Sequence, residues 1–267
     1  MNICTKPLWP LLRLMFRPYL GHAMEPSRKA EPVAMRSADG AALEGAVMVA
    51  GPAPRGVVVL CHPLLPYGYH YFLRNGLARW AAGAGFHVAL FNFQGFGRSA
   101  LGGLCFADDV AGVVGWARER FAGLPIHLAG LSFGGYHAAH ALKRLDGVVA
   151  SAVLDSVPPC ISNVFRSGPS SWLMRALSRS PWAMATGTRP IAASLAPVRR
   201  TPVLLLYGDA DEYCPMEEVS RLAANTRTAW LEVFPGTGHM DGFIVEREAY
   251  TRALRGHWDA AIREVRP

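Results

Sequence analysis

At its centre the chain reads Gly130-Leu131-Ser132-Phe133-Gly134, a G-x-S-x-G pentapeptide. The apolar residues 126–129 before it predict a short buried strand, and the small residues 135–142 after it predict a helix. A serine on so sharp a strand-to-helix turn needs flanking glycines, because larger side chains would collide with the neighbouring strand and helix. The turn exposes the hydroxyl at a helix N-terminus, where free N–H groups favour developing negative charge. An ordinary N-capping serine is the alternative, so the setting rather than the pentapeptide indicates a nucleophile.

Two later apolar runs deliver an acid and a histidine. Residues 203–207 predict a buried strand that ends in Gly208 and is followed by acidic residues. Residues 229–234 predict a strand that stops at Pro235, and the glycine-flanked loop after it carries His239. The chain order is therefore serine, acid, histidine, which is the order of the nucleophile-elbow class of hydrolases.

With these residues the chain resembles the α/β-hydrolase superfamily over residues 43–264, and within it the group of monoacylglycerol-lipase-like esterases and serine-aminopeptidase-like members. Two further segments carry the resemblance, namely residues 57–63 and 91–99. In the family, a strand followed by His-Gly forms one side of the oxyanion hole, and a strand followed by R-G-x-G-x-S forms a neighbouring loop. Here Pro63 stands in place of the usual glycine, and Gln94 in place of the usual arginine.

The resemblance implies a Ser-His-Asp triad. Ser132 is the expected nucleophile and His239 the expected base. The triad acid lies three residues after the strand-ending glycine in the family, which implies Asp211, with Asp209 supporting the turn through Asx-type hydrogen bonds. Asp155, which ends another predicted strand, is the alternative acid.

The resemblance also implies an oxyanion hole and a substrate pocket. We expect the backbone N–H groups of Phe133 and Leu64 to bind the oxyanion. The side chains expected to contact substrate are His62, Leu65, Trp172, Trp182 and Met240.

Strands and helices alternate along the chain, which predicts βαβ units and a mostly parallel central sheet with helices on both faces, the α/β-hydrolase fold. The predicted strands cover residues 43–49, 57–60, 88–93, 126–129, 148–154, 203–207 and 229–234. The predicted helices cover residues 71–82, 106–120, 135–145, 216–224 and 243–262. Loops at the carboxyl ends of parallel strands gather at one edge, where we expect the site.

One long segment breaks this alternation. Residues 156–197 are rich in proline and in apolar aromatic side chains, and relatives carry a helical cap between the sixth and seventh strands. We therefore predict a hydrolase domain over residues 33–267 with a lid insertion at 156–197, preceded by an apolar and basic arm and linker over residues 1–32.

The lid region is basic. From residue 156 to 208 there is no Asp or Glu, and the chain carries a formal net charge of +7. The arginines of this region are Arg166, Arg175, Arg179, Arg189, Arg199 and Arg200. They form either a solvated face or a docking face for an anionic partner such as an acyl carrier protein, a CoA ester or a membrane surface. No recognised nucleic-acid module accompanies them, so nucleic acid is not an expected partner.

The N-terminal segment and the cysteines bear on location. Residues 8–20 are apolar but interrupted by Arg13 and Arg17, too short and too charged to span a bilayer and poor as a signal peptide. They suit an interfacial helix, a cover over the mouth of the active site, or an arm packed on the core. The five cysteines are an odd number without metal-ligand spacing, which predicts no metal site and a reducing compartment. We expect a cytoplasmic protein, with membrane association through the N-terminal segment as an alternative.

Taken together, the residues predict serine-nucleophile acyl transfer on a small-molecule acyl substrate without metal or organic cofactor. Hydrolysis of a carboxylic ester is the first interpretation. Thioester hydrolysis or acyl transfer from CoA or a carrier protein is the second. A ligand-binding protein that retains the hydrolase fold is a third, although a pure binder has no need of all three triad residue types.

Overall fold

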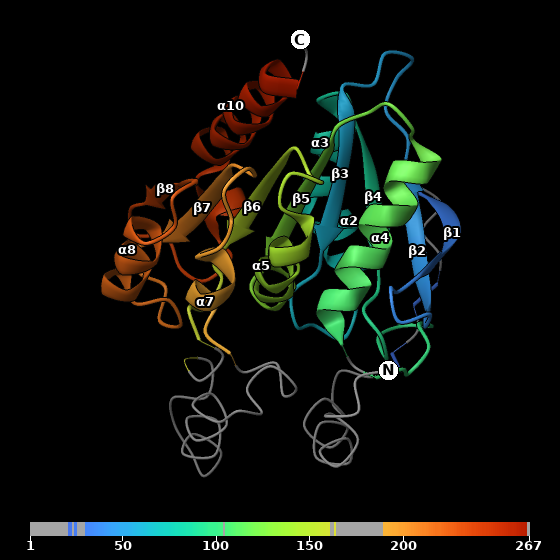
Figure 1. Ribbon diagram of the computed structural model, residues 1–267, viewed down its shortest axis with the longest axis horizontal. Coiled ribbons are helices and arrows are strands. Elements are labelled where there is room, and N and C mark those ends of the chain that lie inside the picture. Colours follow the sequence, from blue (N-terminus) through green and yellow to red (C-terminus); the bar gives the residue numbers. More distant parts are fainter. Residues whose placement is uncertain are drawn as a thin grey trace.

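The computed structural model describes residues 21–22, 24–25, 30–103, 105–160, 163 and 189–265. Its centre is an eight-stranded sheet with the order β1-β2-β4-β3-β5-β6-β7-β8 (Figure 1). The strands are β1 (Glu31–Arg36), β2 (Ala42–Met48), β3 (Gly56–Cys61), β4 (Phe86–Phe91), β5 (Ile126–Leu131), β6 (Ser151–Asp155), β7 (Val203–Gly208) and β8 (Ala229–Phe234). β2 pairs antiparallel with β1 and with β4, and all other pairs are parallel. The sheet is mostly parallel, as predicted.

The central strands are apolar because both faces of the sheet are covered. Every residue of β3, β4, β5, β6 and β7 is buried. Strands covered on both faces read as continuous runs of Val, Leu and Ile rather than as an alternating pattern. The edge strand β8 is instead only partly buried, and Trp230 on it is 68% exposed.

Helices cover the two faces and create two core clusters. The helices are α2 (His70–Asn75), α3 (Leu77–Gly83), α4 (Phe106–Arg120), α5 (Phe133–Leu145), α7 (Ala192–Leu195), α8 (Met216–Ala224), α9 (Gly242–Val245) and α10 (Arg247–Val265). Helices α4, α5 and α7, in front of the sheet in Figure 1, contribute Val113, Leu142 and Leu195 to one cluster. Helices α2, α3 and α10 contribute Phe72, Leu77 and Trp258 to the other.

Two predicted helices are each split in the structure. The predicted helix over residues 71–82 is two helices, because Gly76 between α2 and α3 adopts φ 90°, which ends the first helix. The predicted helix over residues 243–262 is the short α9 followed by α10, with a break at Glu246.

One strand was not predicted from the sequence. β1 begins at Glu31, inside the predicted linker, and contains Pro32. An edge strand tolerates proline because one side of its backbone lacks a strand partner. The strand alternates only weakly between buried and exposed residues, which is why no pattern indicated it.

Parts of the predicted arm and lid lie outside the described residues, namely residues 1–20, 23 and 26–29 of the arm and linker and residues 161–162 and 164–188 of the lid. The described end of the lid region packs into the body of the protein, since Ile191, Leu195 and Val198 belong to a core cluster. Among the helices that the structure describes, none combines the length and the apolar character needed to cross a membrane.

Candidate active site

Ser132 lies on a sharp turn between β5 and α5. Its backbone adopts φ 48° and ψ −115°, and its N–H donates to the carbonyl oxygen of Asp155 at 2.8 Å. A Cβ atom on Gly130 would lie 2.6 Å from the backbone of Gly135, and one on Gly134 would lie 2.1 Å from the carbonyl oxygen of Cys61. The turn therefore requires both glycines of the pentapeptide, as predicted, because real Cβ atoms do not approach backbone so closely.

Asp211 is held in a tight loop after β7. Its Oδ1 accepts the N–H of Tyr213 at 2.9 Å, and its side chain is fully buried. The neighbouring Ala210 N–H donates to the Thr237 carbonyl at 3.2 Å, which ties the acid loop to the loop after β8. The carboxylate thus has one oxygen fixed by backbone and the other available to a second partner.

Asp209 has a different role from the predicted local Asx turn. Its Oδ1 accepts the N–H of Gly236 at 2.6 Å, from the loop after β8. Asp209 is exposed and braces the histidine loop across a long sequence separation instead of closing its own turn.

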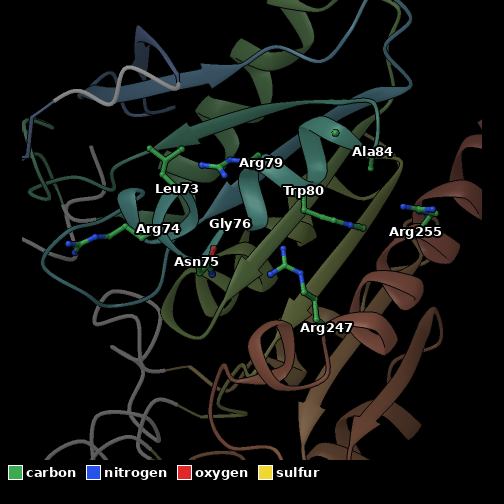
Figure 2. Close-up of a pocket in the computed structure, with 10 residues that line it drawn as sticks. Leu73, Arg74, Asn75, Gly76, Arg79, Trp80, Ala84, Arg247 and Arg255 are labelled. Atoms are coloured by element: carbon green, nitrogen blue, oxygen red, sulfur yellow. The ribbon is translucent and has the colours of Figure 1, made fainter.

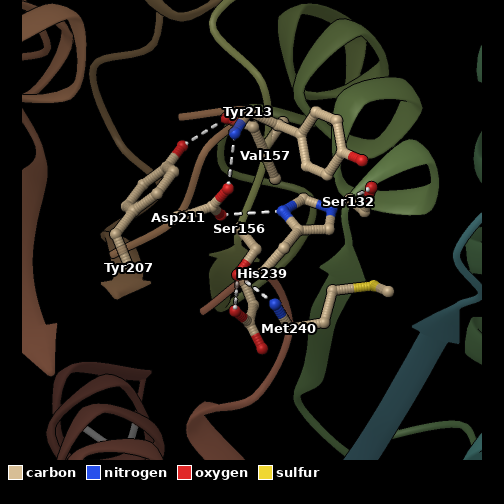
Figure 3. Close-up of polar contacts among 9 residues, drawn as sticks. Ser132, Ser156, Val157, Tyr207, Asp211, Tyr213, His239 and Met240 are labelled. Atoms are coloured by element: carbon tan, nitrogen blue, oxygen red, sulfur yellow. Dashed lines mark hydrogen bonds and ion pairs between the residues drawn. The ribbon is translucent and has the colours of Figure 1, made fainter. Parts of the chain in front are cut away.

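His239 bridges the acid and the serine, as Figure 3 shows. Its Nδ1 lies 2.7 Å from Asp211 Oδ2, and its Nε2 lies 2.9 Å from Ser132 Oγ. Because the carboxylate only accepts, Nδ1 carries the proton, and Nε2 is left to accept the serine hydroxyl. The imidazole also contacts the Tyr213 ring, with centroids 4.9 Å apart. Such a chain of carboxylate, imidazole and hydroxyl can remove a proton from the serine.

The loop after β3 lies against the elbow. The close approach of Gly134 to Cys61 and His62 brings residues 62–65 next to the start of α5, which begins at Phe133. Leu64 and Leu65 are half-buried in this loop. The structure thus brings the predicted oxyanion donors onto adjacent segments, and their role in binding an oxyanion stays a prediction.

His62 does not line a substrate surface, contrary to the prediction. It is fully buried, its Nε2 accepts the N–H of Phe93 at 3.2 Å, and its Nδ1 donates to the carbonyl of Pro63 at 2.8 Å. The ring packs edge-on against Phe93 and Phe96, with centroids 4.9 Å from each. Burial lowers the pKa of His62 to about 4. The neutral ring therefore joins the loop after β3 to the loop after β4, and both nitrogens are in use.

Gln94 occupies the position where the family carries arginine, and its partners explain the exchange. Its backbone N–H and side-chain amide donate to the two carboxylate oxygens of Asp109 at 2.8 and 2.7 Å, and the amide also reaches Asp39 at 3.1 Å. Burial raises the pKa of Asp109 to about 7. A neutral donor at residue 94 therefore faces a carboxyl group that readily takes up a proton.

The remaining predicted pocket residues have mixed outcomes. Met240 follows His239, is half-buried and adopts a positive φ of 61°; Figure 3 shows it beside the histidine. Trp172 and Trp182 lie outside the described residues.

Three groups at the site have the spacing of a metal cluster. Single ligand atoms of Asp211, Cys214 and His239 lie within 4.8 Å of one another. Burial raises the pKa of the Cys214 thiol far above its usual range, and Asp211 adds to this effect, so the sulfur stays protonated. A thiol is a poor metal ligand, and the carboxylate already holds the imidazole. The donor set thus fits a hydrogen-bonded acid and base better than a metal ion.

The carboxylate of Asp155, the alternative acid, bonds two hydroxyl groups and not His239. Its Oδ2 accepts the hydroxyl of Tyr250 at 2.6 Å, and its Oδ1 accepts the hydroxyl of Ser156 at 2.9 Å. Burial raises its pKa to about 6. The imidazole of His239 bonds Asp211 and not Asp155. Ser156 and Tyr250 were not predicted from the sequence, since neither lies in a recognisable motif. The polar Asp155-Ser156 pair at the end of an apolar strand is a signal that could have indicated Ser156.

A separate groove lies between α2, α3 and α10, with a volume of about 560 Å³ (Figure 2). Exposed Arg74, Arg79, Arg247 and Arg255 and the partly buried Trp80 contribute to its lining. No acidic residue and no triad residue is among the described residues that line it. The groove is a basic surface distinct from the triad.

Comparisons with known proteins agree with this architecture. A family model described as "Serine aminopeptidase, S33" matches residues 52–180. An esterase of Pyrococcus furiosus, Pf2001, superposes with a TM-score of 0.71 at 17% identity, covering 90% of this chain and 97% of its own. The α/β hydrolase GrgF of Penicillium sp. sh18 gives a TM-score of 0.69 at 18% identity, with 87% and 99% covered.

A proline iminopeptidase of Mycobacterium smegmatis superposes with a TM-score of 0.64 at 16% identity, covering 87% of this chain and 99% of its own. A search of curated proteins gives no sequence match. The solved structures share the fold, and at these identities they do not fix the bond that is cleaved. The solved structures, together with the sheet order and the sharp turn at Ser132, show that the chain has the α/β-hydrolase fold, and residues 52–180 match the serine aminopeptidase family model.

Proposed function

We propose that the protein is a serine hydrolase that cleaves a carboxylic ester through an acyl-enzyme intermediate. The observation that carries the proposal is the unbroken hydrogen-bond chain from Asp211 through His239 to Ser132, with both contacts between 2.7 and 2.9 Å. The esterases among the structures that share this fold agree with it.

The chemistry begins at the serine. Ser132 Oγ attacks the ester carbonyl carbon while His239 Nε2 takes its proton. Asp211 keeps the imidazole in the tautomer that leaves Nε2 free to accept, and it stabilises the imidazolium once formed. The tetrahedral intermediate places a negative charge on the former carbonyl oxygen, which the N–H groups of Phe133 and Leu64 would bind.

The intermediate then breaks down in two stages. The C–O bond to the leaving group breaks, and His239 returns its proton to the departing alcohol, which leaves the acyl group on Ser132. Water attacks this acyl-enzyme with His239 again acting as base, and the carboxylic acid is released. Every proton is returned, so no cofactor is needed.

The test combines covalent labelling with hydrolysis. We expect a fluorophosphonate to label Ser132, as located by mass spectrometry, and Ser132→Ala to abolish labelling and lower ester turnover by roughly 10⁴- to 10⁶-fold. Ser99→Ala is the control, because the Ser99 hydroxyl is buried and bonds the backbone of Asn92 and Glu44. An adduct on another serine of the folded wild-type protein would contradict the proposal.

A matched panel of oxygen esters, thioesters and anilides with the same acyl group identifies the bond. We expect the highest kcat/KM for the oxygen esters. A higher kcat/KM for the thioesters would instead indicate thioester hydrolysis or acyl transfer, catalysed by the same three residues.

A further inference from the structure

Backbone strain gathers at the site. In the parts of the chain that the structure describes, three residues other than glycine adopt a positive φ: Ser132 at 48°, Ser156 at 51° and Met240 at 61°. Such a backbone conformation is strained and persists only where its surroundings hold it. Ser132 is the proposed nucleophile and Met240 follows the proposed base. Ser156 has no part in the triad, so its strain calls for another explanation.

Hydrogen bonds hold Ser156 from three sides. Its backbone N–H donates to the carbonyl of Leu206 in β7 at 2.9 Å. Its hydroxyl accepts the N–H of Met240 at 3.0 Å, as Figure 3 shows. Because that N–H can only donate, the single hydroxyl proton is free to go to Asp155 Oδ1, which lies 2.9 Å away. The direction of both bonds is therefore fixed.

Asp155 connects the hydroxyl of Ser156 to two further elements. Its carbonyl oxygen accepts the N–H of Ser132 at 2.8 Å, and its Oδ2 accepts the hydroxyl of Tyr250 from α10 at 2.6 Å. Tyr250 is itself fixed between Phe234 and Phe243, with ring centroids 5.7 and 5.6 Å away. The carboxylate is thus anchored to a packed helix.

We propose that Asp155 and Ser156 form a positioning pair for the histidine loop. The pair holds the backbone of Met240 and hence the adjacent His239, while the Asp155 carbonyl holds the backbone of Ser132. One short segment at the end of β6 thereby sets the separation between the base and the nucleophile. This inference rests on the proposed function, because it assigns the pair a role in the same reaction.

We expect the pair to affect the placement of His239 relative to Ser132 rather than the affinity for substrate. A displacement of about 1 Å in a reacting group can cost on the order of 10²-fold in rate. Loss of the Ser156 hydroxyl leaves the Met240 N–H without its acceptor and frees the loop to shift. The shift changes the contact of His239 Nε2 with Ser132, so the loss should fall more on kcat than on KM.

The test compares Ser156→Ala and Ser156→Gly with the wild type, as full-length proteins. Both lose the hydroxyl, but glycine adopts positive φ without strain, so the two variants separate the effect of the hydroxyl from that of the backbone. We expect both variants to lower kcat by about 10- to 100-fold with KM changed less than about twofold. The downfield proton NMR resonance of His239 Nδ1–H should shift or broaden in both.

Ser99→Ala is the matched control. The Ser99 hydroxyl, like that of Ser156, is buried; it accepts the N–H of Glu44 at 2.9 Å and donates to the carbonyl oxygen of Asn92 at 2.7 Å. Its loss should lower thermal stability without moving kcat or the imidazole resonance. A second variant, Tyr250→Phe, keeps the ring and removes only the bond to Asp155, and it should lower kcat in the same direction but less than Ser156→Ala.

The outcomes separate the two proposals. If Ser132 is labelled in the wild type but the Ser156 and Tyr250 variants match Ser99→Ala in kcat and in the resonance, the positioning role is wrong and the hydrolase stands. If the folded wild type is neither labelled nor active on any acyl substrate, the proposed function is wrong, and the positioning role falls with it.

Discussion

The imidazole Nδ1 of His239 lies 2.7 Å from Oδ2 of Asp211, while the other oxygen of the same carboxylate accepts the Tyr213 N–H at 2.9 Å. The hydrogen bond from the Tyr213 backbone therefore holds the Asp211 carboxylate in the orientation in which its other oxygen contacts His239. A carboxylate that cannot rotate fixes both the tautomer and the direction of the ring, which is what a proton-transfer role requires.

Asp211→Asn should lower kcat by about 10⁴-fold, because an amide can donate to Nδ1 and so favour the wrong tautomer. Circular dichroism and thermal melts should show that folding is largely kept. Asp209→Asn is the comparison, since Asp209 is exposed and its carboxylate accepts the N–H of Gly236. A larger loss of turnover from Asp209→Asn than from Asp211→Asn would reverse the assignment.

Gly134→Ala should prevent stable folding at the elbow. The added Cβ would meet the carbonyl oxygen of Cys61 at 2.1 Å, and backbone cannot move away as a flexible side chain can. Gly256→Ala is the matched control on α10, where nothing lies within 4 Å of the added atom. It should stabilise the protein by about 0.5–1 kcal/mol, because alanine favours a helix interior over glycine. Urea unfolding of both variants checks this, and a Gly134→Ala protein as stable as wild type would show that the elbow does not require glycine at this position.

The parts of the fold that follow a local pattern could be predicted from the sequence. Helices α4 and α8 begin and end where the apolar spacing indicated, and residues 203–207 form a strand that delivers Asp211 beside His239. The three proposed triad residues come together because each follows a parallel strand, and these strands end at one edge of the sheet.

The features that the sequence did not reveal depend on contacts between distant segments. The break at Gly76 could not be predicted, because an isolated glycine occurs both inside helices and at their ends. The support role of His62 depends on Phe93, and that of Ser156 on Met240. No periodicity records such pairs, since each joins loops from different strands.

The dependence of stability on pH follows from buried histidines and carboxyls that shift in opposite directions. Burial lowers the pKa of His62, His140 and His257 to about 4 and that of His127 to about 3, from a usual value of 6.5. The unfolded chain therefore binds more protons than the native state between pH 6.5 and 4. The stability these histidines confer is present above pH 6.5 and is lost as the pH falls through this window.

The carboxyls of Asp109 and Asp155 act against the histidines, since burial raises their pKa values to about 7 and about 6 from 3.8. Their contribution is present below pH 3.8 and is lost as the pH rises. Burial also lowers the pKa of His137 well below its usual value, so the histidines outnumber the two carboxyls and unfolding takes up protons near pH 5.5.

We therefore expect the free energy of unfolding, measured with urea, to fall as the pH is lowered from 6 to 5. His257→Gln should flatten this slope by about one proton, because glutamine can still donate to the Ala152 carbonyl, which His257 Nε2 contacts at 3.1 Å, but cannot titrate. A wild-type stability that rises on acidification from pH 6 to 5 would mean that the two carboxyls dominate, and that the histidines are hydrated in the native state.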